Sequence, residues 1–103
     1  MSVVAATLLT PTTDAANSNL IAAFGRNLPL TLVATGLGVG ETVTLEVSVD
    51  GGTTWQTAYD TGNAITLTST DNMLGIHTPG LFRAAKSATA GPSGVFSFRE
   101  EQG

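Results

Sequence analysis

Alternation of apolar and polar side chains is the main pattern along this chain, and it predicts β-strands. Residues 42–49 read Thr-Val-Thr-Leu-Glu-Val-Ser-Val, so every second side chain is apolar. Because successive side chains of a strand point to opposite faces, this segment predicts a half-buried antiparallel strand. Its four aliphatic residues are expected to face a core: Val43, Leu45, Val47 and Val49.

A second alternating segment, residues 28–35, precedes that strand across a glycine-rich turn. Its apolar series is Leu28, Leu30, Leu32 and Ala34. Proline has no amide to donate to a sheet ladder, so Pro29 predicts that this strand begins at a sheet edge.

Further short strands follow at regular intervals. The expected segments are 54–59, 64–68, 73–77, 81–87 and 94–99. The side chains expected to face the core are Ile65, Leu67, Phe82, Ala84, Phe96 and Phe98. Clusters of Asp, Asn, Gly and Pro separate the strands, as turns require. The pattern predicts an all-β fold, either an antiparallel β-sandwich or a jelly-roll-like barrel of about seven to nine short strands.

The first 27 residues are harder to place than the rest. Residues 2–10 are compatible with a strand, and residues 11–18 form a polar segment. We therefore expect residues 1–27 to be either an N-terminal arm or the opening strands of the fold. Residues 28–103 are expected to form the β-sandwich domain. An arm so poor in charge is expected to lie against something, such as a neighbouring subunit.

Composition narrows the class of protein. The 103 residues fit one domain, and 42% hydrophobic with 12% charged residues argues against wholesale disorder. Four basic and eight acidic residues cannot neutralise a run of phosphates, so we expect no nucleic-acid partner. The absence of cysteine excludes disulfides and zinc–thiolate sites. No segment is long and apolar enough for a signal core or a membrane span, so we expect a soluble protein made in a cytoplasm.

The sharpest local motif is the string Ser48-Val-Asp50-Gly-Gly52-Thr-Thr54-Trp55. Its spacing suits a tight hairpin in which the Asp carboxylate accepts turn amides, glycine supplies positive φ and the Trp covers the base. The string resembles the Asp-box, which repeats once per blade in sialidase-type propellers. Here it occurs once, and 103 residues cannot build several blades, so we predict a structural hairpin.

A wider resemblance extends from about residue 30 to residue 99. The string Asp-Gly-Gly-Thr-Thr-Trp is followed by His77-Thr-Pro-Gly-Leu-Phe-Arg83 and then by a glycine-rich turn and a last strand. This order is similar to small all-β virion proteins of tailed bacteriophages. The resemblance implies a capsid decoration or cement role in a virion assembled in the host cytoplasm. It also implies a major capsid protein or another virion protein as partner, and a homo-oligomer, with a trimer favoured.

Few residues of the sequence suggest catalytic, metal-binding or phosphate-binding chemistry. His77 is the only histidine, and a catalytic base needs an oriented partner and a nucleophile within hydrogen-bond reach. Asp60, Asp71 and Asn72 lack a regular metal-ligand spacing and suit Asx turns better. Residues 36–40, Gly-Leu-Gly-Val-Gly, lack the spacing and the following helix of a phosphate loop. We expect no catalytic residue, no metal and no cofactor.

A second function class stays open. Trp55 and Tyr59 would share one face of an extended segment 54–59, and aromatic rings on a β-sandwich can stack on sugars. The alternative is therefore a glycan- or receptor-binding β-sandwich module of a tail or head fibre, or of a secreted protein. The terminal pair Glu100-Glu101 is expected to be a solvated tail.

Overall fold

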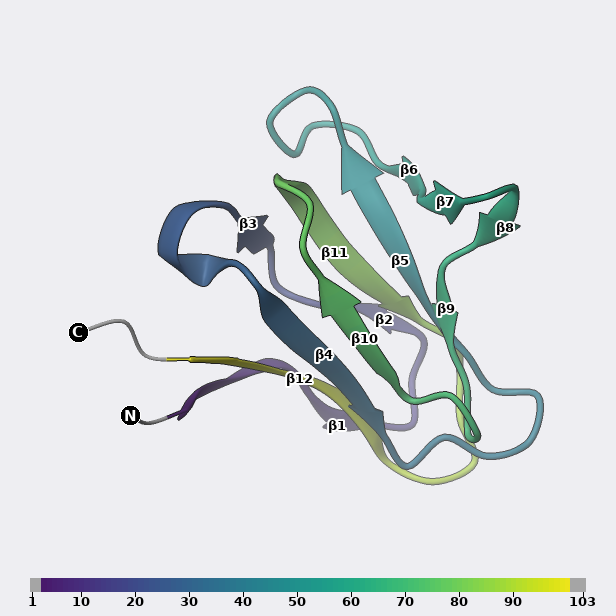
Figure 1. Ribbon diagram of the computed structural model, residues 1–103. Helices are drawn as coiled ribbons and strands as arrows, with labels where there is room; N and C mark the ends of the chain where they lie inside the picture. Colours follow the sequence, from purple (N-terminus) through teal and green to yellow (C-terminus); the bar gives the residue numbers. More distant parts are fainter. Residues whose placement is uncertain (1–2, 101–103) are drawn as a thin grey trace.

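The computed structural model describes residues 3–100, which form two antiparallel β-sheets packed around one apolar core (Figure 1). The described residues contain twelve strands and one short 3-10 helix, η1 (Gly25–Asn27). The all-β antiparallel sandwich predicted from alternation is therefore confirmed. There are more strands than expected, because several of them are only two residues long.

The four-stranded sheet has the order β1–β12–β4–β10, and all neighbours are antiparallel. Its strands are β1 (Val3–Thr12), β12 (Ser93–Glu100), β4 (Leu30–Thr35) and β10 (Met73–Ile76). The first and last strands of the chain are neighbours, and Val3 lies opposite Glu100. The two ends of the described chain therefore meet at one end of the sandwich (Figure 1).

The six-stranded sheet is centred on β11 and β5, which pair from Leu81 opposite Ser48 to Lys86 opposite Val43. Its strands are β2 (Ala16–Asn17), β3 (Ile21–Ala23), β11 (Gly80–Lys86), β5 (Val43–Ser48), β6 (Gln56–Thr57) and β9 (Thr66–Leu67). Both β2 and β3 pair with β11, and both β6 and β9 pair with β5. A separate small hairpin is formed by β7 (Tyr59–Asp60) and β8 (Asn63–Ala64).

Alternate residues of the central strands make the core. Leu30, Leu32 and Ala34 of β4 join Val43 and Leu45 of β5, and each is 7% exposed or less. These positions confirm the inward faces predicted for the two alternating segments. Four inward positions predicted for the later strands are also confirmed: Leu67 and Ala84 are buried, and Ile65 and Phe82 are partly buried and pack against the core.

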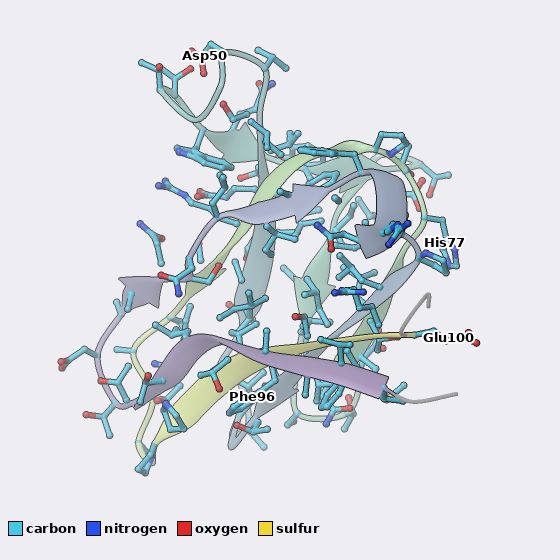
Figure 2. All side chains as sticks on the ribbon, turned by 90° about the vertical axis from the view of Figure 1, so that its left-hand side faces the viewer. Asp50, His77, Phe96 and Glu100 are labelled. Atoms are coloured by element: carbon cyan, nitrogen blue, oxygen red, sulfur yellow. The ribbon has the colours of Figure 1, made fainter. Side chains whose placement is uncertain are left out.

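The predicted inward pair Phe96 and Phe98 is wrong. Val95 is fully buried and lies opposite Ala34, so alternation turns both phenylalanines to the other face of β12. Figure 2 shows Phe96 on the side of β12 away from the six-stranded sheet. Antiparallel pairing with β4 fixes this phase, because β4 directs Leu32 and Ala34 inward.

Two further expectations are corrected. Val49 is 83% exposed, because β5 ends at Ser48 and the chain turns away from the core there. Pro29 does not mark an edge, since β4 lies between β12 and β10. Pro29 precedes the first paired residue of the strand, where its missing amide costs no ladder hydrogen bond.

Residues 3–27 lie in both sheets. β1 pairs with β12 from Val3 to Thr12, with register shifts after Thr7 and after Leu9. The chain then crosses to the other sheet, where β2 and β3 pair with β11. Residues 1–2, the start of the expected arm, and Glu101, in the expected solvated tail, lie outside the described residues.

Candidate interaction surfaces

The hairpin motif is organised by two side chains. The hydroxyl of Ser48 accepts the Gly52 amide at 2.8 Å and donates to the Asp50 carboxylate at 2.8 Å. The same carboxylate accepts the Thr54 amide at 2.9 Å and also the Thr54 hydroxyl. Gly51 and Gly52 have φ of 74° and 95°, which is the left-handed region that glycine tolerates. The hydrogen bonds of the motif therefore run between its own residues.

These hydrogen bonds change the acidity of Asp50. Bonds from the Thr54 side chain, then the Thr54 amide and then Ser48 lower its pKa from 3.8 to about 2. Donors to a carboxylate stabilise its ionised form, which is why the pKa falls. Asp50 is thus a fixed anion that already has its partners, and it offers little to a ligand.

Trp55 lies over the polar outer surface of the six-stranded sheet. The guanidinium carbon of Arg83 is 4.7 Å from the centroid of its ring. Arg83 also donates from Nε to Glu46 Oε1 at 2.6 Å. The ring therefore covers an ion pair beside the hairpin base and does not stand free as a sugar-stacking platform.

The glycine-rich loop 36–41 is held by a carboxylate. Glu41 accepts the Gly38 amide at 2.6 Å and the Ala90 amide at 2.7 Å, and these bonds lower its pKa. A Cβ on Gly36 would lie 2.2 Å from the Pro92 carbonyl oxygen, so the two loops touch closely. A phosphate would have to displace Glu41 from the Gly38 amide, which disfavours anion binding at this loop.

Lys86 is a buried cation at the same end of the sandwich. It is 4% exposed, and its Nζ donates to the Asp14 and Ser87 carbonyls at 2.7 Å and to the Thr89 hydroxyl at 3.2 Å. All three ammonium protons therefore have acceptors. Lys86 ties together segments that are distant in sequence, and sequence reasoning missed it.

The outer face of the four-stranded sheet is the candidate interaction surface. By outer face we mean the side of this sheet that points away from the buried residues Leu32 and Ala34. Strand register and side-chain alternation decide which residues lie on it. Thr35 and Gly94 lie on this face at one end of β4 and β12, and its other ten members are Val3, Ala5, Thr7, Thr31, Val33, Met73, Gly75, Phe96, Phe98 and Glu100. Nine of these ten are uncharged, and Glu100 stands at the end of β12.

Large apolar side chains on the outer face are open to solvent. Val3 is 68% exposed, Met73 is 61% exposed and Phe98 is 37% exposed. Register places Val33 directly between Phe96 and Met73, so the apolar side chains form one continuous row across three strands. A shallow groove of about 540 Å³ lies at one end of this face, between Val3, Phe98 and His77.

A second groove, of about 700 Å³, opens along the edge of the sandwich between β10 and the β6–β7 segment. Core side chains such as Leu45 and Ile76 form its apolar lining, while Tyr59, Asp60 and His77 contribute polar atoms. Tyr59 is 67% exposed there. The expected extended segment 54–59 is broken at Ala58, and Trp55, unlike Tyr59, does not line this groove.

The remaining candidate residues are dispersed. Asp60 lies in the β7–β8 hairpin, whereas Asp71 lies in the turn before β10, where its amide and carbonyl bond to Thr68. The His77 ring folds back over Gly75. Within residues 3–100 no group of three or more metal-ligating side chains gathers. In the same part of the chain no helix is long and apolar enough to cross a membrane.

The sequence contained a signal for the outer face that alternation alone did not reveal. The segment 30–34, Leu-Thr-Leu-Val-Ala, has Val33 among its outward positions, and residues 95–98 have apolar residues in both phases. A strand that is apolar in both phases has two faces to bury. The Asp50 hairpin is separate from this face: Figure 2 shows Asp50 at the top of the view and Phe96 in its lower half.

Comparison of the chain with protein-family models, with curated proteins and with solved structures gives no match in any of the three.

Proposed function

We propose that this chain is a non-enzymatic structural protein of a tailed-phage virion that binds the shell through the outer face of its four-stranded sheet. The partner is the major capsid protein or another virion protein. One observation carries the proposal: the outer face holds a continuous row of apolar side chains that are exposed or half-buried, although the inner face of the same sheet already forms the core.

Physical reasoning favours a protein partner for such a face. An antiparallel sheet in a sandwich ordinarily keeps one face solvated and polar. Isolated apolar residues on a surface are common, but a contiguous row marks an interaction site. A nearly uncharged surface suits a neutral protein surface, because neither partner has to desolvate an ion. Many weakly bound copies on one lattice would gain avidity if each bridges two shell subunits.

The internal partners of the charged groups support a structural role. The Asp50 carboxylate accepts hydrogen bonds from Thr54, Arg83 pairs with Glu46, and Lys86 donates to main-chain carbonyls. These charges hold turns and loops in place. The two strings that carry the phage resemblance occupy the Ser48–Trp55 hairpin and the turn that leads into β11, so both are turn signatures.

The role is tested first by copy number. Quantitative mass spectrometry of purified particles of the phage that encodes this chain would give its ratio to the shell protein. Copies in the hundreds are expected for a decoration protein. A few dozen or fewer would place the chain in the tail or at a vertex, and complete absence would contradict the virion role.

The proposed surface is tested by a charge placed on it. Met73→Glu should lower binding to particles that lack the protein by more than tenfold, because an ion must then be buried without a partner. The matched control is Val49→Glu, which adds the same charge at an exposed aliphatic residue near the hairpin. Equal binding of the two variants would contradict the outer face as the docking surface.

A second candidate function is glycan or receptor binding by a fibre or secreted module. The observation in its favour is the edge groove of about 700 Å³ with the exposed Tyr59 and the side chains of Asp60 and His77. In this case glycan-array binding should be lost on Tyr59→Ala with the fold intact. Trp55 is less suited to contact a sugar because Arg83 lies on its ring. No binding by the wild-type chain to any glycan would exclude sugars as the ligand.

A further inference from the structure

The free edges of the two sheets differ in length. Across residues 3–100 the strands at the edges of the two sheets are β10, with four residues, β3, with three, β2, β6 and β9, with two each, and β1, with ten. Very short edge strands are one way in which proteins prevent pairing with another chain. The edge at β1 lacks that protection.

The first half of β1 also lacks the other usual protections. Residues Val3–Thr7 carry no charge and no proline, and their register with β12 has no shift. Four of the five are exposed. Beyond Thr7 the strand is irregular, and other segments contact it, since the Asn19 amide donates to the Leu8 carbonyl and Thr89 donates to the Thr12 carbonyl.

We propose that two copies of this chain pair antiparallel along Val3–Thr7 of β1, across a two-fold axis that passes beside Ala5. In this pairing Ala5 faces Ala5 of the second copy, Val4 faces Ala6 and Val3 faces Thr7. Every cross-strand pair joins small or β-branched neutral side chains, so no like charges meet. An isologous contact of this kind closes after two copies and cannot grow into a fibre.

The pairing joins two four-stranded sheets into one sheet of eight strands. Val3 and Ala5 belong to the outer face, so the outer faces of the two copies become continuous across the axis. The dimer forms whether or not the chain binds a virion, so its test is independent of the proposed function. This dimer is an alternative to the trimer that the phage resemblance implies.

The absence of cysteine allows a direct test. Residues opposite each other in an antiparallel pair have Cα atoms about 4.5–5.5 Å apart, which is within disulfide range. Ala5→Cys, oxidised with glutathione disulfide, should therefore give a covalent dimer in high yield. Thr7→Cys is the matched control: the two cysteines would be four residues out of register, about 13 Å apart along the strands, and should remain largely monomeric.

Solution measurements complete the test. Sedimentation of the wild-type chain should show a concentration-dependent dimer, and Ala5→Lys should weaken it by about tenfold or more, because two ammonium groups meet at the axis. Thr57→Lys on β6 should leave the dimer unchanged. The proposal is overturned by a wild-type chain that is monomeric at all concentrations. It is equally overturned by a trimer whose cross-links join cysteines at positions 5 and 73, which would mean head-to-tail pairing of β1 with β10.

Discussion

The outer faces of the two sheets have opposite chemistry. On the six-stranded sheet, Arg83 pairs with Glu46 and contacts the Trp55 ring, and the neighbouring outward positions Thr44 and Thr57 are polar. The apolar outward residues of this sheet, Leu81 and Ala85, are half-buried. On the four-stranded sheet, outward positions hold aliphatic and aromatic side chains that nothing covers within the described residues. The sandwich therefore has one face whose charged groups are paired with each other and one face with exposed apolar side chains.

The difference indicates which side chains of this fold are available for binding. Groups that already hold their partners, such as Asp50 or Arg83, stabilise the fold, and using them for binding would cost stability. Exposed apolar side chains contribute little to the fold, and covering them on binding releases water at no such cost. The four-stranded sheet is thus the side on which association is expected.

The largest expected effect separates the two faces of a single strand. Leu32→Ala opens a cavity in the core and should lower the free energy of unfolding by about 2–5 kcal/mol. Val33 is the next residue but lies on the outer face, so Val33→Ala should lower the free energy of unfolding by less than about 1 kcal/mol. Urea denaturation measures both. Equal losses would show that the outer face is already packed and has nothing to offer a partner.

The next effect concerns the polar face. Arg83→Ala removes the ion pair with Glu46 and uncovers the Trp55 ring, which should cost about 1–2 kcal/mol. Trp55 is the only tryptophan, so its fluorescence should shift to longer wavelength as water reaches the ring. Arg26→Ala, at an exposed residue of η1, removes the same charge as a control. An unchanged spectrum would mean that Arg83 does not cover Trp55 in solution.

A smaller effect should appear as a dependence on pH. The pKa of Asp50 is lowered by folding, so its ionised form stabilises the folded chain above the ordinary value of 3.8. That contribution should disappear as the pH falls through about 2. The Tm should therefore drop over this window, with Glu41 adding to the drop. Asp50→Asn should have a lower Tm at pH 7 and a flatter profile; identical profiles would contradict the hairpin geometry.

The smallest effect compares two buried serines. Ser48 has its hydroxyl fully engaged in the hairpin, and Ser48→Ala should cost about 1 kcal/mol. Ser93 is fully buried and its hydroxyl has no hydrogen-bond partner. Ser93→Ala should therefore be neutral or stabilising by up to about 1 kcal/mol. A large loss at Ser93 would show that its hydroxyl has a partner in solution.

Local chemistry made much of the fold predictable. The strand at residues 42–48 and its hairpin follow from strict alternation and from a Ser, an Asp and two glycines at fixed spacing. These interactions lie within a few residues of each other, so the sequence specifies them without knowledge of the rest. The inward faces of Leu45 and Leu32 were also predictable, because one phase of each strand is wholly apolar and the other is mainly polar, with Val33 as the exception.

Long-range pairing made the rest unpredictable. Residues 95–98 contain apolar side chains in both phases, and only the register with β4 decides that Val95 faces the core and Phe96 does not. The outer face likewise combines strands from both ends and from the middle of the chain. One of the three acceptors of Lys86 is the carbonyl of Asp14, which is 72 residues away. No local pattern reports such neighbours.

Site-specific labelling tests the central claim most directly. The chain has no cysteine, so single cysteines at Met73 on the outer face and at Thr57 on the polar face can each be modified with a maleimide. Both should react readily in the free protein. On the assembled particle, position 73 should be protected and position 57 should stay reactive. The opposite pattern, or equal reactivity at both positions, would contradict docking through the four-stranded sheet.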